Sequence, residues 1–417
     1  MKTRLLVRGP ALSQSGYGEQ TRFALRALRS REDLFDVYLH NVPWGNTGWI
    51  CKDDEEREWI DSIITKTEID KQSRRNYDVS LQITIPNEWK KEAPINIGYT
   101  AGIETSMVAP VWIQLGDQMD HIIVVSNHSK NVYKNTKINI ANETGTIIQE
   151  NVSVATPITV VNFPTRVAES SLEGLDLTTD FNFLTVAQWG PRKNLQKTIK
   201  CFVEEFANED VGLVVKTNIG KNNKLDRENT KKTLKQALEK FPDKKCKVYL
   251  LHGVLSEEEL SGLYQHPKIK AYVSLTHGEG FGLPLFESAY YGLPVIAPVW
   301  SGQCDYLNMP TVNKNGKEKI KTMCAKVDHV LKRVGEDAVW DGVIDKHSSW
   351  AYPSHASYKN KLRDVYKDHN RFKSQAKKLQ AWILENFSAA QKYEEFVSCI
   401  VETIDSDKTQ EQEVMVL

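Results

Sequence analysis

The sequence predicts an α/β protein with two Rossmann-like domains that face a cleft, and three observations support this prediction. The chain has 417 residues, which is more than one ordinary domain holds. Short runs rich in β-branched residues alternate with longer amphipathic runs, as in repeated units of strand, helix and parallel strand. A polar stretch near residues 165–180 interrupts this alternation, which then starts again.

The first domain is predicted to cover residues 1–165. Strands are expected near residues 4–8, 36–40, 78–84, 95–99, 121–126 and 157–162, and helices near 18–30, 108–119 and 128–134. Residues 166–180 are small, polar and rich in turn formers, and they show no strong periodicity. They are therefore predicted to form the linker between the two domains.

The second domain is predicted to cover residues 181–385. Strands are expected near residues 181–189, 212–218, 247–253, 271–277 and 293–298, and helices from about residue 194 and near 227–240, 257–264 and 283–291. The stretch from about 355 to 404 is rich in Lys, Arg and aromatic residues and is predicted to be helical. The final residues, SDKTQEQEVMVL, are expected to form a loose tail.

Composition argues against several classes of protein. The 54 basic and 54 acidic residues give a formal net charge of zero, so strong global attraction to nucleic acid or membranes is not indicated. No apolar run approaches the roughly 20 residues that span a bilayer, and MKTRLLVRGP lacks the apolar core of a signal peptide. The six cysteines form no CxxC pair, which favours neither a zinc site nor a disulfide framework. A cytoplasmic location is therefore expected.

The most informative stretch is THGEGFGLPLFESAYYGLPVIAP, residues 276–298. A strand is predicted before it and a helix within it, so HGEGFG is a strand-to-helix turn, where open α/β sheets bind their ligands. Its glycines allow backbone to come close to a ligand, and the amides at the start of the helix favour a phosphate. A plain turn, with glycines for bending and glutamates for solubility, is the alternative interpretation.

Two glutamates in this stretch suggest what accompanies the phosphate. Glu279 is not a phosphate ligand, because like charges repel, but a carboxylate accepts hydrogen bonds from sugar hydroxyls. Glu287 lies about two helical turns further on and could accept from a ribose diol. The arrangement suggests a sugar, a diphosphate and a ribose in a row, which is a nucleotide sugar.

The string E-G-F-G-L-P-x-x-E, followed by A-x-x-G-x-P-V-I-A, resembles the E-x7-E motif of the family-4 (group 1) retaining glycosyltransferases. Supporting segments occur in the family's order at residues 184–195, 250–264, 300–307 and 386–396. The resemblance implies the GT-B architecture, with the C-terminal residues 386–417 returning to the N-terminal domain. It also implies a nucleotide-diphosphate sugar as donor, transfer with retention, and no metal or other cofactor.

The resemblance assigns roles to side chains of the second domain. Glu279 would hold sugar hydroxyls and place the donor, and Glu287 would bind the ribose. Lys193 would neutralise the leaving diphosphate, with Arg192 as a weaker candidate. The backbone of the turn would contact the diphosphate at Gly280, Phe281, Gly282 and Leu283.

The chain departs from the family pattern just after the strand 181–189. The family commonly has a G-R-like pair where this chain has Ala187 and Gln188, and Gln188 can donate a hydrogen bond but carries no charge. Leaving-group stabilisation is then expected to depend more on the neighbouring basic residues or on Lys216, which ends the next strand. By the same resemblance Val254 edges the base pocket, whereas His252 is at least as readily structural.

The first domain is expected to contribute Gly16 and Glu104. Gly16 lies in a glycine-containing loop that resembles the family's donor-phosphate loop, and its spacing differs from the GxGxxG of NAD-binding proteins. Many family members have a histidine at the end of the strand 95–99, but this chain has none between residues 95 and 112. Glu104 is predicted to bind or polarise the acceptor hydroxyl, or equally to cap a helix near Thr105 and Ser106.

Two other interpretations stay open. Gln188 and the missing histidine agree with a non-catalytic nucleotide-sugar-binding protein of the same fold. The acceptor of an active enzyme could be a glycan, a lipid-linked precursor or a hydroxymethylated base of viral DNA. The basic stretches 71–76, 88–94 and 359–378 could line a groove for DNA, or they could be solvated faces. The donor base, the sugar and the oligomeric state are not predicted.

Overall fold

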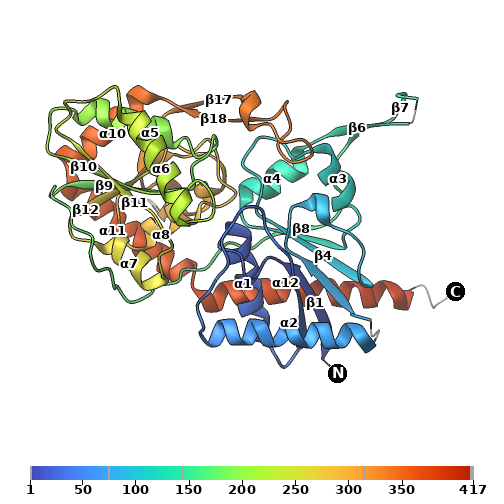
Figure 1. The fold of residues 1–417 in the computed structure, drawn as a ribbon. Helices are drawn as coiled ribbons and strands as arrows, with labels where there is room; N and C mark the ends of the chain where they lie inside the picture. The colour runs from blue at the N-terminus through green and yellow to red at the C-terminus, as the bar shows by residue number, and fades with distance from the viewer. Residues whose placement is uncertain (1, 74–75, 143, 313–315, 414–417) are drawn as a thin grey trace. The chain divides into compact units, whose positions relative to one another are not determined.

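The computed structural model describes residues 2–73, 76–142, 144–312 and 316–413, and it divides into two compact units (Figure 1). The first unit consists of Met1–Pro164, Val339–Ser348 and Ala389–Leu417. The second unit consists of Thr165–Ala338 and Ser349–Ser388. Each unit has its own parallel sheet of six strands, so the predicted pair of Rossmann-like domains is confirmed.

The sheet of the first unit has the strand order β2-β1-β3-β4-β5-β8. Central strands such as β3 and β4 are buried along their whole length, as strands covered on both faces are. The strands are β1 (Thr3–Gly9), β2 (Phe35–Asn41), β3 (Val79–Gln82), β4 (Ile95–Thr100), β5 (His121–Val124) and β8 (Ile158–Val160). A hairpin of β6 (Ile138–Ala141) and β7 (Ile147–Val152) stands apart from this sheet.

The helices of the first unit include one from the far end of the chain. They are α1 (Gly16–Arg29), α2 (Glu55–Ser73), α3 (Pro110–Gly116), α4 (Asn127–Asn135) and α12 (Ala389–Glu413). Helix α12 lies along α1 in Figure 1, and the rings of Phe23 and Phe396 pack 5.3 Å apart between them. The expected return of the C-terminal helix is therefore confirmed.

The sheet of the second unit has the strand order β11-β10-β9-β12-β13-β16. Its strands are β9 (Asn182–Val186), β10 (Gly212–Lys216), β11 (Lys247–Leu251), β12 (Ile269–Val273), β13 (Val295–Pro298) and β16 (Ala325–Val327). Its helices are α5 (Leu195–Phe206), α6 (Lys224–Leu238), α7 (Glu257–Gln265), α8 (Leu283–Tyr290), α9 (Cys304–Leu307), α10 (His355–Lys367) and α11 (His369–Asn386). Phe183, Phe202 and Phe206 form the centre of the core on one face of the sheet.

Two hairpins of the second unit were not expected from the sequence. One pairs β14 (Asn308–Val312) with β15 (Glu318–Thr322), and the other pairs β17 (His329–Arg333) with β18 (Ser349–Pro353). Most residues of β15 and β17 are exposed and several are charged, so these strands lack the buried apolar pattern that identifies a strand in a sequence.

The division of the chain into two units differs from the predicted domain boundaries in three places. Residues 339–348 fold with the first unit although they lie within the predicted second domain. The predicted linker 166–180 packs on the second unit, where the Ser171 amide donates to the Glu258 carbonyl at 3.0 Å. The predicted loose tail is helical as far as Glu413, and residues 414–417 lie outside the described residues.

Candidate functional site

The candidate site lies at the point in the second unit where the strand order reverses. Strand β9 pairs with β10 on one side and with β12 on the other, and both pairs are parallel. The loops that leave the carboxyl ends of β9 and β12 therefore diverge around a crevice, which is where open α/β sheets bind ligands. The loop after β9 carries Arg192 and Lys193, and the loop after β12 carries Glu279.

Glu279 is buried, with 4% of its surface exposed, and it forms ion pairs with both basic residues. Lys193 Nζ lies 2.7 Å from each of the two carboxylate oxygens. Arg192 donates to one of these oxygens at 2.9 Å and to the Gly278 carbonyl at 2.9 Å. The structure thus brings together the three residues for which the sequence predicted the largest roles.

The two cations determine the protonation state of Glu279. Burial on its own would raise the pKa of the carboxyl, but the charges of Lys193 and Arg192 outweigh it and hold the pKa at about 2. The side chain is therefore ionised at neutral pH. It can accept hydrogen bonds from hydroxyl groups but has no proton to donate as a general acid.

This ion pair should make the protein sensitive to acid. The folded pKa of Glu279 lies below its ordinary value of 4.5, so its stabilising contribution is present above pH 4.5 and is lost as the pH falls toward 2. The loss is about 3 kcal/mol. Urea unfolding at a series of pH values should show this loss in the wild type and a weaker one in Glu279→Gln. Equal pH slopes for the two proteins would contradict the assignment.

The Glu279 loop is held by the segment that follows β13. The Glu279 amide donates to Ser301 Oγ at 2.9 Å, and the Gly302 amide donates to the Glu279 carbonyl at 2.9 Å. Ser301 has a φ of 66°, a left-handed conformation that is uncommon for a residue with a side chain. A Cβ at Gly302 would lie 1.9 Å from the Gly280 carbonyl oxygen, so the two loops pack backbone against backbone.

Gly302→Ala should therefore destabilise the second unit by about 1–3 kcal/mol or more, because an added methyl group meets backbone that cannot move aside cheaply. Thermal unfolding measures the effect. Gly190→Ala is the matched control, because a Cβ at Gly190 would have no atom within 4 Å. Equal melting temperatures for the two variants would show that the loops are not packed this closely.

Helix α8 begins directly after the turn. Gly282 is its N-cap with a φ of 91°, and Leu283 is the first helical residue. The Tyr306 hydroxyl donates to the carbonyls of Phe281 and Gly282 at 3.1 and 3.0 Å. These bonds turn the carbonyls toward the protein, and the positive end of the helix dipole lies at the predicted diphosphate position.

Glu287 lies on α8 and is half-buried. Its carboxylate accepts a hydrogen bond from the buried hydroxyl of Tyr264 at 2.8 Å. The position on the helix agrees with the expected spacing from Glu279, and the ribose role stays a prediction.

The remaining predicted donor residues of this unit end neighbouring strands. Lys216 ends β10, and its Nζ donates to the Gly253 carbonyl at 2.7 Å, while burial lowers its pKa. Gln188 is exposed after β9 and donates to the Ile219 carbonyl at 3.0 Å. Val254 follows β11 and is 56% exposed. All three lie at the carboxyl edge of the sheet.

His252 has a structural partner that sequence reasoning missed. Its Nε2 lies 2.9 Å from Asp226 Oδ2, and Asp226 also accepts from the amides of Gly220 and Asn222 at 2.9 and 3.2 Å. The carboxylate thereby fixes the loop that follows β10. Asp226 lies in the first turn of α6, where an acidic residue is common and gives no signal of such a role.

The first unit places Gly16 and Glu104 at the carboxyl ends of its own strands. Gly16 opens α1, and a Cβ there would meet no atom within 4 Å. Tyr17, which the sequence did not single out, is bonded to the Thr100 hydroxyl at 2.7 Å. Burial and then the charge of Glu104 raise the pKa of Tyr17. Helix α3 begins at Pro110 with Ala109 as its N-cap, so Glu104 does not cap it.

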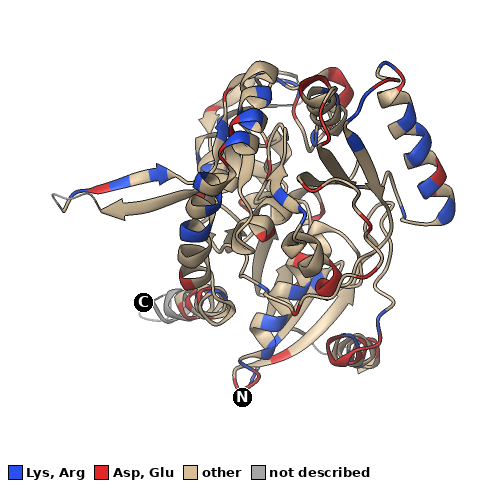
Figure 2. Cartoon of the chain, turned by 90° about the vertical axis from the view of Figure 1, so that its left-hand side faces the viewer, with Lys and Arg blue, Asp and Glu red and all other residues tan. Residues whose placement is uncertain are grey.

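The basic stretches are partly ion-paired where the structure describes them. In α10, Lys359 pairs with Glu204, and Arg363 pairs with Glu205 and Glu209. Lys71 and Lys90 pair with nearby acids, and residues 74 and 75 lie outside the described residues. Figure 2 shows basic and acidic residues over the face turned toward the viewer, with basic residues along one strand of the hairpin at the left. The pairs in α10 favour a solvated face there.

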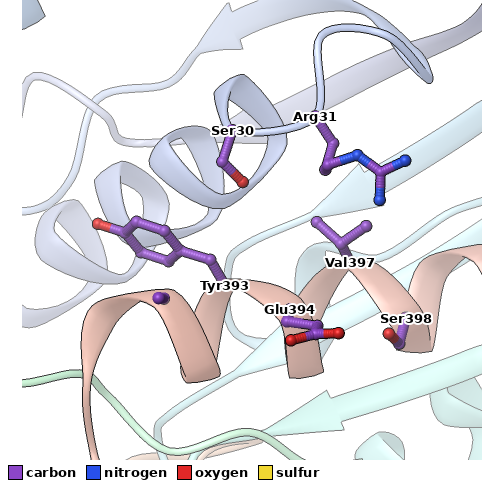
Figure 3. Close-up of a pocket in the computed structure, with 7 residues that line it drawn as sticks. Ser30, Arg31, Tyr393, Glu394, Val397 and Ser398 are labelled. Carbon is purple, nitrogen blue, oxygen red and sulfur yellow. The ribbon is translucent and has the colours of Figure 1, made fainter.

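A hollow of about 500 Å³ in the first unit contains none of the predicted site residues (Figure 3). It lies between the C-terminal end of α1 and the start of α12. Its lining residues are Ser30, Arg31, Ala390, Tyr393, Glu394, Val397 and Ser398. This hollow is therefore a feature separate from the Glu279 site.

No group of three or more His, Cys, Asp or Glu side chains among the described residues could hold a metal ion. None of the helices described is both long and apolar enough to cross a membrane.

Known structures share the fold of the whole chain. A sucrose-phosphate synthase from Thermosynechococcus elongatus is similar with a TM-score of 0.62 and 11% identity, over 97% of this chain and 100% of that one. The Anabaena protein HepE, solved in complex with UDP and glucose, is similar with a TM-score of 0.58 and 12% identity, over 97% and 100%. A glycosyltransferase from Rickettsia africae is similar with a TM-score of 0.57 and 13% identity, over 97% and 99%.

No curated protein matches the chain in sequence. Residues 172–320 match the family "Glycosyl transferases group 1", and this segment includes both loops of the site. The resemblance expected from the E-x7-E motif agrees with this family match, and the similar structures confirm the expected GT-B fold.

Proposed function

We propose that the protein is a retaining glycosyltransferase that moves a sugar from a nucleotide-diphosphate sugar to an acceptor hydroxyl without a metal ion. One observation carries the proposal. A buried, ionised Glu279 is held by Lys193 and Arg192 at the strand-order switch of the second unit, one turn before the start of α8. This places a hydroxyl acceptor, two cations and a helix N-terminus at one edge of the sheet.

The reaction breaks the bond between the anomeric carbon and the diphosphate oxygen. The electron pair stays with that oxygen, so the leaving group gains negative charge, which Lys193, Arg192 and the first amides of α8 stabilise. By family precedent, the acceptor hydroxyl attacks from the face that the leaving group vacates. Its proton passes to an oxygen of the departing diphosphate, so the reaction needs no strong protein base.

The ion pair with Glu279 has a second consequence. Without donor, the carboxylate neutralises Lys193 and Arg192. A bound diphosphate supplies the negative charge in its place, and sugar hydroxyls then donate to the Glu279 oxygens. Donor binding therefore changes the partners of Glu279, Lys193 and Arg192, which are already in position. The entropy lost by ordering side chains on binding is then small.

The donor is proposed to be a UDP-sugar, supported by the structural similarity to the UDP-binding HepE. Glu287 would bind its ribose, and Val254 would lie beside the base. Lys216 would supply the leaving diphosphate with the positive charge that Gln188 does not carry. Glu104 and Gly16 of the first unit would serve the acceptor and the donor phosphate. The acceptor is proposed to be a hydroxyl of a glycan, of a lipid-linked precursor or of a hydroxymethylated DNA base.

Calorimetric titration with UDP-, GDP-, ADP- and dTDP-linked sugars tests the donor assignment. We expect a UDP-linked sugar to bind better than the others, and Lys193→Ala to weaken that binding. Binding to none of these nucleotide sugars would contradict the proposal.

A non-catalytic nucleotide-sugar-binding protein is the second candidate. It is favoured by Gln188, which is uncharged, exposed and bonded to the Ile219 carbonyl. Such a protein would bind a donor in the titration but neither hydrolyse nor transfer it.

A further inference from the structure

The Glu279 loop is fastened to a part of the chain that the proposed reaction does not use. His277, two residues before Glu279, is 9% exposed and contacts the hairpin strand β18 through its carbonyl, its Nδ1 and its ring, whose centroid also lies 4.7 Å from that of the Tyr352 ring. Its carbonyl accepts from the Ala351 amide at 2.9 Å, and its Nδ1 lies 2.6 Å from the Ala351 carbonyl. Its ring stacks on Trp350, with centroids 4.8 Å apart and planes 10° apart.

These contacts leave His277 little freedom. A carbonyl oxygen only accepts, so Nδ1 carries the proton of the His277 ring. On the other side of the loop, the His277 amide donates to the Arg192 carbonyl at 2.9 Å. The backbone at His277 is thus clamped between β18 and the residue that pairs with Glu279.

The connection between β17 and β18 makes specific contacts of its own. Its connection includes residues 339–348, which fold as part of the first unit. There the Gly342 carbonyl accepts from Asn87 Nδ2 at 2.8 Å and from Trp112 Nε1 at 3.0 Å. Val343 packs against the apolar cluster around Trp112. The connection is therefore fixed at its far end by specific contacts and not only by chain continuity.

We infer that the β17–β18 hairpin is a brace that sets the position of Glu279, with His277 as the positioning residue. The inference rests on the proposed function for its effect on activity. Glu279 and its partners must be placed closely for the sugar to react, because small displacements of positioning groups lower rates steeply. The brace supplies this placement from a segment that lies 70 residues beyond the motif in the sequence.

Two substitutions separate the contacts of His277. His277→Phe keeps a ring that can stack on Trp350 and loses the donor to Ala351, whereas His277→Asn keeps a side-chain donor and loses the stacked ring. We expect each to lower kcat for transfer or donor hydrolysis by about tenfold, and His277→Ala to lower it by about a hundredfold. Affinity for UDP should change less than kcat. Leu331→Ala is the control, because this β17 side chain is 52% exposed.

Hydrogen exchange tests the brace independently of activity. In His277→Ala, the amides of residues 276–280 should exchange faster while the melting temperature of the protein falls little. A second variant, Trp350→Ala, removes the ring on which His277 stacks. It should raise exchange in the same amides and lower kcat in the same direction, by a smaller factor.

The outcomes are distinguishable from failure of the proposed function. A wild type that binds no nucleotide sugar would remove the proposed function, while exchange at residues 276–280 would still report on the brace. Unchanged exchange and unchanged kcat in His277→Ala would overturn the brace itself. An effect in His277→Ala with none in Trp350→Ala would overturn the stacked ring as part of the brace.

Discussion

Replacing Lys193 with alanine should lower kcat for sugar transfer by about a hundredfold to a thousandfold. Its ammonium group lies 2.7 Å from both oxygens of Glu279, which lies in the loop that precedes α8. Negative charge develops on the diphosphate as the sugar leaves, and a fixed cation in a partly buried site stabilises that charge more than water does. Arg192 is more exposed and pairs with a single carboxylate oxygen, so Arg192→Ala should have a smaller effect.

The measurement is kcat and KM for the donor, with hydrolysis as the readout until an acceptor is known. Lys197→Ala is the matched control, because Lys197 is an exposed lysine four residues further along the chain. Its rates should equal those of the wild type. Normal rates in Lys193→Ala, with the protein folded, would show that this lysine does not face the leaving group.

Replacing Glu279 with glutamine should remove activity and also reduce stability. Glutamine keeps the size of the side chain, but it leaves Lys193 and Arg192 without their negative partner in a buried site. Breaking a buried pair in this way costs about 3 kcal/mol, and the sugar loses an acceptor that is charged at neutral pH. The double variant Glu279→Gln with Lys193→Met should regain much of the stability and none of the activity.

Urea unfolding and donor hydrolysis, measured on the same preparations, test this prediction. Glu228→Gln is the control for the loss of one carboxylate, because Glu228 is exposed on α6. Full activity in Glu279→Gln would contradict the proposed role of the carboxylate. A stability equal to that of the wild type would contradict the buried ion pair.

The fold class and the centre of the site were predictable because their signals are local. Alternating apolar runs mark the parallel strands, and the glycines around Glu279 mark a turn at a ligand-binding edge. Lys193 and Arg192 were assigned by the resemblance to the family, and the structure shows that they follow β9, the strand beside β12. In a parallel sheet, residues that follow adjacent strands meet at one edge.

The support of the site was not predictable in the same way. His277 and Ala351 are 74 residues apart in the sequence, and nothing in either segment indicates the other. The left-handed conformation of Ser301 is imposed by packing between loops, because serine has no local preference for it. Asp226 looks like an ordinary first-turn acid until its loop contacts are known. Such residues act through tertiary contacts, which leave no periodic pattern.

Hydrolysis of the bound donor tests the central claim most directly. The nucleotide sugar that binds best would be incubated with the wild type and with Lys193→Ala, and the released sugar followed by proton NMR at its anomeric centre. The account predicts slow release by the wild type, initially with the anomeric configuration of the donor, and far slower release by the variant. Tight binding of the donor with no release, and no transfer to any hydroxyl offered, would contradict it and identify a non-catalytic binding protein.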